Sequence, residues 1–241
     1  LKMQKKVAPY IKRIITPSKS SKQGIVDEFN CNKANITVIN NGLDTNEFSP
    51  VNEVKRNEYR LITTASADVP LKGLDFSLKA LKKLKKDFPN IHLIVIGLIK
   101  KGGHTEKLIR KLGLENDVTF KSNLTKNEIK DCYSKSSIAI VSSLYEGFGY
   151  PVIEAMSCEI PLIATNVSSI PELTSEFAKL VDPKNEEMIY QSVKDILSEY
   201  DKYKKIAIKG RQHVIKNFNW IKITDEYENA IFETIKNYEK C

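Results

Sequence analysis

The sequence predicts an α/β protein in which a parallel sheet carries helices on both faces. Short runs rich in β-branched and apolar residues recur along the chain, and stretches with apolar residues at helical spacing separate them. Several runs, such as residues 138–141, are apolar without alternation, which is typical of strands buried on both faces. Strands that alternate with helices in this way form parallel sheets.

The N-terminal residues are predicted to form a fragment of an α/β unit. A strand is expected over 11–15, and a helix then starts with Ser18 or Ser20 as its N-cap and runs to residue 30. A second strand covers 36–39. Residues 43–58 are polar and lack periodicity, which predicts an inter-domain linker.

A longer α/β series is predicted from residue 59 onwards. Its helix over 74–88 has an apolar stripe at helical spacing, and Thr125 with Glu128 forms a capping box at the start of another helix. The expected strands cover 59–64, 91–97, 118–121, 138–141, 162–165 and 178–181. The expected helices cover 74–88, 104–112 and 125–135, a stretch from Pro151, and finally 186–200, 202–217 and 221–238.

Composition indicates a folded protein with a sizeable core. The 241 residues are 41% hydrophobic and 28% charged, which fits one large or two small domains. No apolar run approaches the roughly 18 residues of a membrane span, and no signal-peptide pattern is present. Since the first residue is Leu1, we expect a piece of a longer polypeptide. Four scattered cysteines without a C-x-x-C pair argue against a zinc site and fit reduced thiols in the cytosol.

The formal net charge of +8 has several interpretations. A basic balance fits nucleic acid, acidic membrane or phosphorylated ligands. Much of the charge, however, is lysine on predicted helix faces such as 74–88, and a solvated face is the favoured interpretation. No basic strand with interleaved aromatic residues is present, so nucleic-acid binding ranks last among the candidate functions.

Residues 142–156 are the most informative stretch of the chain. They follow the strand at 138–141, pass through two glycines and reach Pro151, a residue suited to the start of a helix. A strand, a glycine loop and a helix N-terminus bring backbone N–H groups to the carboxyl edge of a sheet, where anions bind. Glu146 lies on the loop, and Glu154 is expected in the first turn of the helix. A turn and a dipole-stabilised glutamate are common by themselves, so these features alone are weak evidence of function.

The whole string is much more specific. Glu-Gly-Phe-Gly-Tyr-Pro-Val-Ile-Glu, from Glu146 to Glu154, resembles the motif of retaining glycosyltransferases of family 4, which have two Rossmann-like domains in the GT-B architecture. The continuation to Pro171-Glu172 fits too, and Asn41-Gly42-Leu43-Asp44 resembles the family's hinge.

The resemblance also implies a division of the chain. Residues 1–48 would be the end of an acceptor-side domain with the hinge, 49–217 the Rossmann-like nucleotide-sugar-binding domain, and 218–241 a helix that crosses back. Most of the first domain would be absent, so this chain alone is expected to be inactive.

By the same resemblance, each site residue has an expected role. Glu146 would be the catalytic residue beside the transferred sugar, Lys72 would clamp the diphosphate, and Glu154 would accept hydrogen bonds from both ribose hydroxyls. From its own context, Lys72 before a helix is as readily a surface lysine. The family has an arginine five positions before this lysine, where the chain has Ala67; what replaces it is left open. The other expected donor-site residues are Gly73, Phe120, Lys121, Ser122, Phe148, Gly149 and Tyr150.

The resemblance further implies a reaction and its participants. A nucleotide-diphosphate-sugar would transfer its sugar to a glycan, lipid or small-molecule acceptor by front-face attack, with the leaving phosphate taking the acceptor's proton. No metal or other cofactor is expected, and the chain has no Asp-x-Asp triplet. The protein would be cytoplasmic, and contact with the inner face of the membrane and the oligomeric state are left open.

Three other functions compete with sugar transfer. A non-catalytic nucleotide-sugar-binding module is favoured by Ala67, and a sugar-nucleotide epimerase shares the architecture but not the glutamate string. A nicotinamide-dependent enzyme is disfavoured because Gly-x-Gly-x-x-Gly is missing after the first strand of the longer series. Among the histidines, His92 is expected to be packed and His213 solvated, whereas a pocket-facing His104 is left open.

Overall fold

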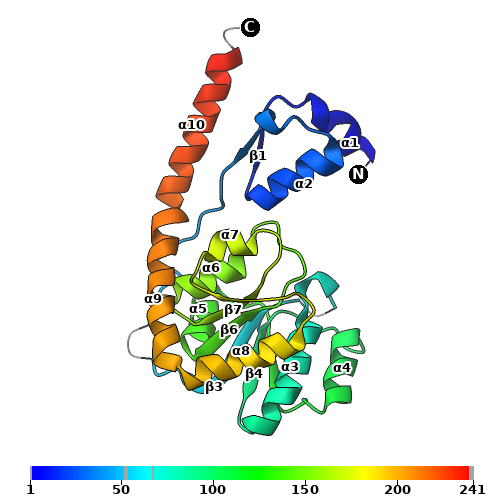
Figure 1. Cartoon of the computed structure of the whole chain (residues 1–241), viewed down its shortest axis with the longest axis vertical. Helices are drawn as coiled ribbons and strands as arrows, with labels where there is room; N and C mark the ends of the chain where they lie inside the picture. Colours follow the sequence, from blue (N-terminus) through cyan, green and yellow to red (C-terminus); the bar gives the residue numbers. More distant parts are fainter. Residues whose placement is uncertain (1, 52–53, 67, 239–241) are drawn as a thin grey trace.

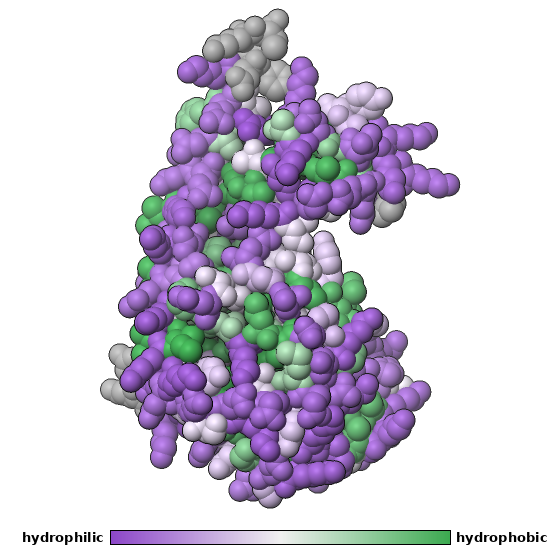
Figure 2. All heavy atoms as spheres, in the orientation of Figure 1, coloured by the Kyte–Doolittle hydropathy of each residue, from purple (hydrophilic) through white to green (hydrophobic). Residues whose placement is uncertain are grey.

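The computed structural model describes residues 2–51, 54–66 and 68–238, and it contains two separate parallel sheets. Figure 1 shows a small unit, formed by residues 2–39, and a larger body below it. Helices α9 (Tyr200–Asn217) and α10 (Trp220–Tyr238) run along one side of both. The surface is hollowed between the small unit and the body on the side away from α10 (Figure 2).

The small unit is a strand–helix–strand fragment with a short extra helix in front. Its elements are α1 (Lys2–Val7), η1 (Ala8–Tyr10), β1 (Ile14–Thr16), α2 (Lys19–Phe29), η2 (Lys33–Asn35) and β2 (Ile36–Val38). Strands β1 and β2 pair in parallel, as the strand–helix–strand prediction requires. Ser18 is the N-cap of α2, since its side chain accepts a hydrogen bond from the Ser21 amide; the alternative cap, Ser20, lies inside the helix. The strand expected over 11–15 starts only at Ile14, because the preceding residues form the η1 turn.

The body is built on a six-stranded, wholly parallel sheet. Its strands are β3 (Asn57–Thr64), β4 (His92–Ile96), β5 (Val118–Lys121), β6 (Ser136–Val141), β7 (Leu162–Thr165) and β8 (Lys179–Val181). They lie in the order β5-β4-β3-β6-β7-β8. Strands β3, β4 and β5 therefore follow one another towards one edge of the sheet. Strand β6 then pairs with the other side of β3, and β7 and β8 continue towards the opposite edge. In such sheets the crevice at the carboxyl ends of the two central strands is the usual ligand site.

Helices cover both faces of this sheet, so the predicted fold class is confirmed. On one face lie α3 (Leu74–Asp87), α4 (His104–Leu112) and α8 (Glu186–Ser198); on the other lie α5 (Lys126–Ser134), α6 (Tyr150–Ser157), α7 (Ile170–Thr174) and α9. In β6, Ile138 and Ile140 join the core beneath α3, whereas Ala139 and Val141 join the core beneath α6. All six residues of β6 are buried, which explains its unbroken apolar and small-residue sequence.

The segment predicted to be an inter-domain linker, residues 43–58, packs on the body at its start and ends in a strand. Leu43 and Phe48 are buried in the core beneath α6, and the Arg211 guanidinium on α9 donates to the backbone carbonyls of Thr45 and Phe48. Strand β3 already begins at Asn57. Two isolated apolar anchors produce no periodicity, so this packing leaves no pattern in the sequence. Helices α1 and α7 were not expected either, because five or six residues are too few to show helical spacing.

His213 is the clearest error among the predicted surface residues. Its ring lies 5.3 Å from the Phe177 ring and 5.6 Å from the Phe218 ring, measured between centroids. Burial lowers the pKa of this histidine. The helix that carries it looks polar in sequence, yet α9 packs against α6, and His213 is on the packed side.

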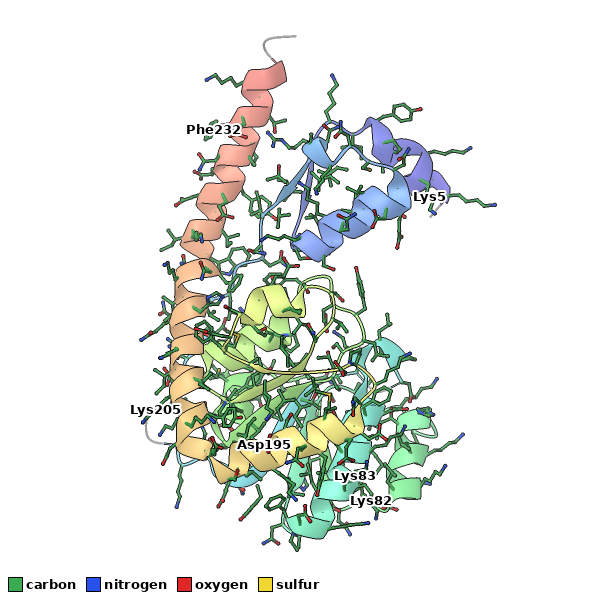
Figure 3. The ribbon with its side chains drawn as sticks, viewed as in Figure 1. Lys5, Lys82, Lys83, Asp195, Lys205 and Phe232 are labelled. Carbon is green, nitrogen blue, oxygen red and sulfur yellow. The ribbon has the colours of Figure 1, made fainter. Side chains whose placement is uncertain are left out.

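Two of the lysines that the sequence placed on a solvated helix face lie on the outside of the body. Lys82 is exposed, and Lys83 pairs with Glu187 at 2.7 Å on the outside of the body, away from the recess (Figure 3). Both residues lie on α3 in the stretch where the sequence predicted solvated lysines. No helix in the described part of the chain is both long and apolar enough to cross a membrane.

Candidate functional site

Two loops meet at the point where the strand order reverses. The lysine loop (residues 65–73, with Ala67 outside the described residues) follows β3, and the glycine loop (residues 142–149) follows β6. Gly73 has a φ of +63°, and a Cβ added there would lie 1.9 Å from the Ser142 carbonyl oxygen. The Leu144 amide donates to the Leu71 carbonyl at 2.7 Å. Only glycine at position 73 lets the two loops come this close.

This contact brings together Lys72 and Glu146. The Lys72 ammonium Nζ donates to Glu146 Oε1 at 2.7 Å, and the Ser143 hydroxyl donates to the same oxygen at 2.7 Å. The Glu146 side chain is 10% exposed and that of Lys72 is 32% exposed. A nearly buried carboxylate requires such partners. An ammonium has three N–H donors, so Lys72 can hold Glu146 and a second anion together.

The backbone of the glycine loop is held by the segment before α7. The Glu146 amide donates to Ser168 Oγ at 3.2 Å, and Ser169 Oγ lies 2.9 Å and 2.5 Å from the carbonyl oxygens of Glu146 and Phe148. Gly149 then has a φ of +110° as the N-cap of α6, a conformation that favours glycine. The loop is therefore fixed by specific contacts directly before the helix N-terminus.

Glu154 lies on α6 in a different environment from Glu146. Helix α6 begins at Tyr150, so Glu154 is its fifth residue and belongs to the second turn, not to the first as expected. The Tyr133 hydroxyl donates to Glu154 Oε2 at 3.1 Å and lies 3.2 Å from Thr64 Oγ1 at the end of β3. Burial raises the pKa of the Glu154 carboxyl above its usual value. A half-buried carboxylate that bonds to a neutral phenol is suited to accept hydrogen bonds from ligand hydroxyls.

Of the three aromatic residues expected around a ligand, only Tyr150 has an exposed side chain. Phe148 is 5% exposed and its ring packs against Phe218 and Tyr150, so only its backbone can face a ligand. Tyr150, the first residue of α6, is 39% exposed beside the loop. The Phe120 side chain packs on the core beneath α3, so a contact of Phe120 with a base would use its backbone.

Beyond Phe120, β5 ends at the outer part of the same carboxyl edge. Ser122 is exposed just past the strand end. The Lys121 side chain lines a separate cavity of about 400 Å³ with Arg60 and His92 on the sheet face. His92 is half-buried and its Nε2 lies 2.8 Å from Thr119 Oγ1, in agreement with the expected packed histidine. Any contact of this segment with a base must therefore use mainly its backbone.

His104 faces a cavity, the alternative that its sequence context left open. The cavity of about 390 Å³ is bounded by Gly73, Leu144 and the start of α4. His104 Nε2 lies 2.7 Å from Asp75 Oδ2. Within the described residues, no group of three or more histidine, cysteine, aspartate or glutamate side chains is arranged to hold a metal ion.

Comparison with known proteins identifies the family in which these loops occur. A family model described as glycosyl transferases group 1 matches residues 45–213, which include the lysine loop, the glycine loop and Glu154. The chain belongs to this family. The match begins at residue 45, directly after the hinge-like residues 41–44.

Two curated relatives are similar over most of this chain. The MMP alpha-(1->4)-mannosyltransferase of Mycolicibacterium hassiacum is 31% identical over 100% of this chain and 57% of its own length. The O-antigen chain mannosyltransferase RfbU of Salmonella typhimurium is 30% identical over 77% of this chain and 51% of its own length. The chain thus spans little more than half the length of these relatives.

Solved structures share the fold. A glycosyltransferase from Rickettsia africae matches with a TM-score of 0.83 and 25% identity, covering 98% of this chain and 67% of that one. Anabaena Alr3699/HepE in complex with UDP and glucose matches with a TM-score of 0.85 and 20% identity, covering 97% of this chain and 68% of that one. The prediction of a GT-B-type fold for this group 1 glycosyltransferase chain is confirmed.

Proposed function

We propose that this chain forms the donor-binding part of an enzyme that transfers a sugar from a nucleotide-diphosphate-sugar to an acceptor with retention of anomeric configuration, as in glycosyltransferase family 4. The observation that carries this proposal is the meeting of Lys72 and Glu146 at the switch point of the sheet, with Glu154 one helix turn further on. The names of the mannosyltransferase relatives, and the UDP and glucose in the Anabaena complex, support a nucleotide-sugar donor.

The diphosphate fits between Lys72 and the N-terminus of α6. The ammonium supplies a positive charge, and backbone N–H groups at Phe148, Gly149 and Tyr150 lie at a helix start, where anions are stabilised. Glu154 takes the ribose, because one carboxylate can accept hydrogen bonds from both hydroxyls of a cis-diol. The base lies against the backbone of residues 120–122 at the end of β5.

Glu146 contacts the transferred sugar. With Lys72 bound to Oε1, the carboxylate lies beside the group that holds the departing diphosphate, which is where the sugar must be attached. The acceptor oxygen forms the new bond to the anomeric carbon, the bond to the phosphate oxygen breaks, and that phosphate takes the acceptor's proton. The chain's residues position the reactants and stabilise the leaving charge, so neither a metal nor another cofactor is part of the scheme.

The same proposal assigns a role to each part of the chain. Residues 1–48 are the end of the acceptor-side domain with the hinge, 49–217 bind the donor, and 218–241 cross back to the first domain. The acceptor is a glycan, a lipid or a small molecule, bound by the small unit together with parts of the protein outside this chain. We place the enzyme in the cytoplasm, where an acceptor at the inner membrane face would also be accessible.

Ligand binding and turnover together test this function. Thermal shift of the chain against UDP, GDP, ADP and their sugars should show stabilisation by one nucleotide, about 2.7 kcal/mol at a hundred times the dissociation constant. The intact protein should then consume the matching nucleotide-sugar only when an acceptor is present. Binding without turnover for any acceptor would indicate a non-catalytic module, and conversion of the sugar without an acceptor would indicate an epimerase.

Replacing Glu154 with glutamine should weaken binding of the nucleoside diphosphate and leave the fold intact. The loss of one charged hydrogen bond is worth about 1.5–3 kcal/mol. Isothermal titration with a ribonucleoside diphosphate and with its 2′,3′-dideoxy analogue measures the effect. The wild type should prefer the ribose form, and the variant should lose most of that preference. Unchanged affinity for the ribose form would refute the ribose assignment.

The pH dependence of binding offers a second check on Glu154. Burial raises the pKa of this carboxyl, so acidification should protonate it at a higher pH than an exposed glutamate. Nucleotide affinity in the wild type should therefore fall as the pH is lowered towards that raised pKa, because the protonated group accepts fewer hydrogen bonds. The Glu154→Gln variant, titrated in parallel, reports the part of the pH dependence that belongs to the nucleotide's own phosphates.

A further inference from the structure

The tip of α2 in the small unit touches the glycine loop of the body. Ser18 Oγ donates to the Gly147 carbonyl at 2.7 Å, and Ser21 Oγ donates to the same oxygen at 3.0 Å. Ser18 is fully buried, whereas Ser21 and Gly147 are partly exposed. Gly147 is the residue next to Glu146, and residues 18 and 147 are 129 positions apart in the chain.

A second contact joins the same helix tip to α7. The amides of Lys19 and Ser20 donate to the two carboxylate oxygens of Glu172 at 2.9 Å and 3.0 Å. The first four N–H groups of a helix lack partners within the helix. In α2, the Ser18 side chain accepts from the Ser21 amide, and Glu172 accepts from the amides of Lys19 and Ser20 from another part of the fold. A carboxylate at a helix N-terminus is also favoured by the helix dipole.

The two segments that α2 contacts, the glycine loop and α7, are themselves linked by hydrogen bonds. Glu172 lies just after Ser168 and Ser169, and these two serines hold the backbone of Glu146 and Phe148. The glycine loop is thus held from one side by the segment before α7 and from the other by α2. Movement of the small unit would release the Gly147 carbonyl and the Glu172 carboxylate together.

We infer that Ser18, Ser21 and Glu172 form a latch through which the small unit sets the position of Glu146. These are positioning residues, because they act on Glu146 through the loop backbone and not on the ligand. The latch rests on the proposed function. It makes transfer depend on closure of the small unit onto the body, while the nucleotide contacts of Lys72 and Glu154 lie within the body alone.

The structure supplies matched variants for a test. Ser21→Ala removes one hydroxyl from Gly147 and leaves the Ser18 cap in place, and Glu172→Ala removes the carboxylate. Ser20→Ala is the control for the first, because Ser20 contributes only its amide. Glu176→Ala is the control for the second, because Glu176 is exposed a few residues further along and carries the same charge.

The double variant Ser21→Ala/Glu172→Ala should lower turnover of the intact protein at least about tenfold, since small displacements of a reacting group are costly. Its affinity for the nucleoside diphosphate should fall by a clearly smaller factor than turnover, because Lys72 and Glu154 keep their contacts while only the Phe148 and Gly149 amides are loosened. The double control Ser20→Ala/Glu176→Ala should behave as the wild type. Restoring Glu172 in the double variant should recover part of the turnover.

Hydrogen exchange gives a readout that does not require activity. The amides of residues 146–149 should exchange about tenfold faster in the latch variant than in the control, while those of β4 stay protected. Equal exchange in both variants would overturn the latch even if the enzyme is active. Equal losses of turnover and nucleotide affinity would show a general structural role instead. A wild-type protein that transfers no sugar, but whose loop loosens in the latch variant, would refute the proposed function and leave the contact itself established.

Discussion

Replacing Glu146 with alanine in the intact protein should lower turnover about a hundredfold, the scale of losing one transition-state contact. Glu146 is held at 2.7 Å by both Lys72 and Ser143, so its carboxylate has a defined position beside the proposed leaving group. Nucleoside diphosphate should still bind nearly as well, because the nucleotide contacts lie on Lys72, α6 and Glu154. Steady-state kinetics and isothermal titration on the same preparation separate the two quantities.

The matched variant Glu146→Gln tests the charge of Glu146 separately from its volume. It keeps an oxygen for the Ser143 hydroxyl but cannot neutralise Lys72, so turnover should again fall strongly. Normal turnover with lost nucleotide affinity in the alanine variant would mean that Glu146 and Glu154 are assigned the wrong way round. Normal turnover with normal affinity would leave the loop without a catalytic residue and favour a binding role.

Replacing Lys72 with alanine should lower affinity for the nucleoside diphosphate by at least about tenfold, and affinity for the bare nucleoside hardly at all. A charged hydrogen bond is worth about 1.5–3 kcal/mol. The variant also leaves Glu146 nearly buried without its cation, which adds a repulsion for the diphosphate. Isothermal titration of both ligands measures the difference.

A double-mutant cycle separates these two consequences of removing Lys72. In Lys72→Ala/Glu146→Ala the uncompensated carboxylate is gone, so part of the lost diphosphate affinity should return. The part that does not return is the direct contribution of the ammonium to phosphate binding. If the nucleoside and the diphosphate lose affinity equally in Lys72→Ala, the lysine has a structural role instead.

Much of the fold could be predicted because its determinants are local. The apolar run of β6 and the stripe of α3 follow from burial, and the Thr125–Glu128 capping box forms as expected, with both reciprocal bonds present. The Glu146-to-Glu154 string identified the site because a strand, a glycine turn and a helix start are written in consecutive residues. These features require only neighbours along the chain, so the sequence by itself determined them.

The partners of the site residues were decided by the tertiary structure. Lys72 and Glu146 are 74 residues apart, and their contact exists because β3 and β6 are adjacent where the strand order reverses. The same adjacency places Tyr133 between Thr64 and Glu154. Strand order arises from packing of the whole sheet, so no local pattern announces these pairs.

The sequence likewise could not predict how His213 packs or where the small unit contacts the body. His213 is predicted to be solvated on a polar helix, yet two aromatic rings partly cover it, because what packs on a helix face decides whether that face is exposed. The contact of α2 with Glu172 depends on how the small unit meets the body. The sequence determined which segments become strands, helices and the glutamate-bearing loop, because hydrogen bonding and periodicity act over a few residues. The tertiary structure alone decided which charges meet and which loop is held, because those contacts join residues that are distant along the chain.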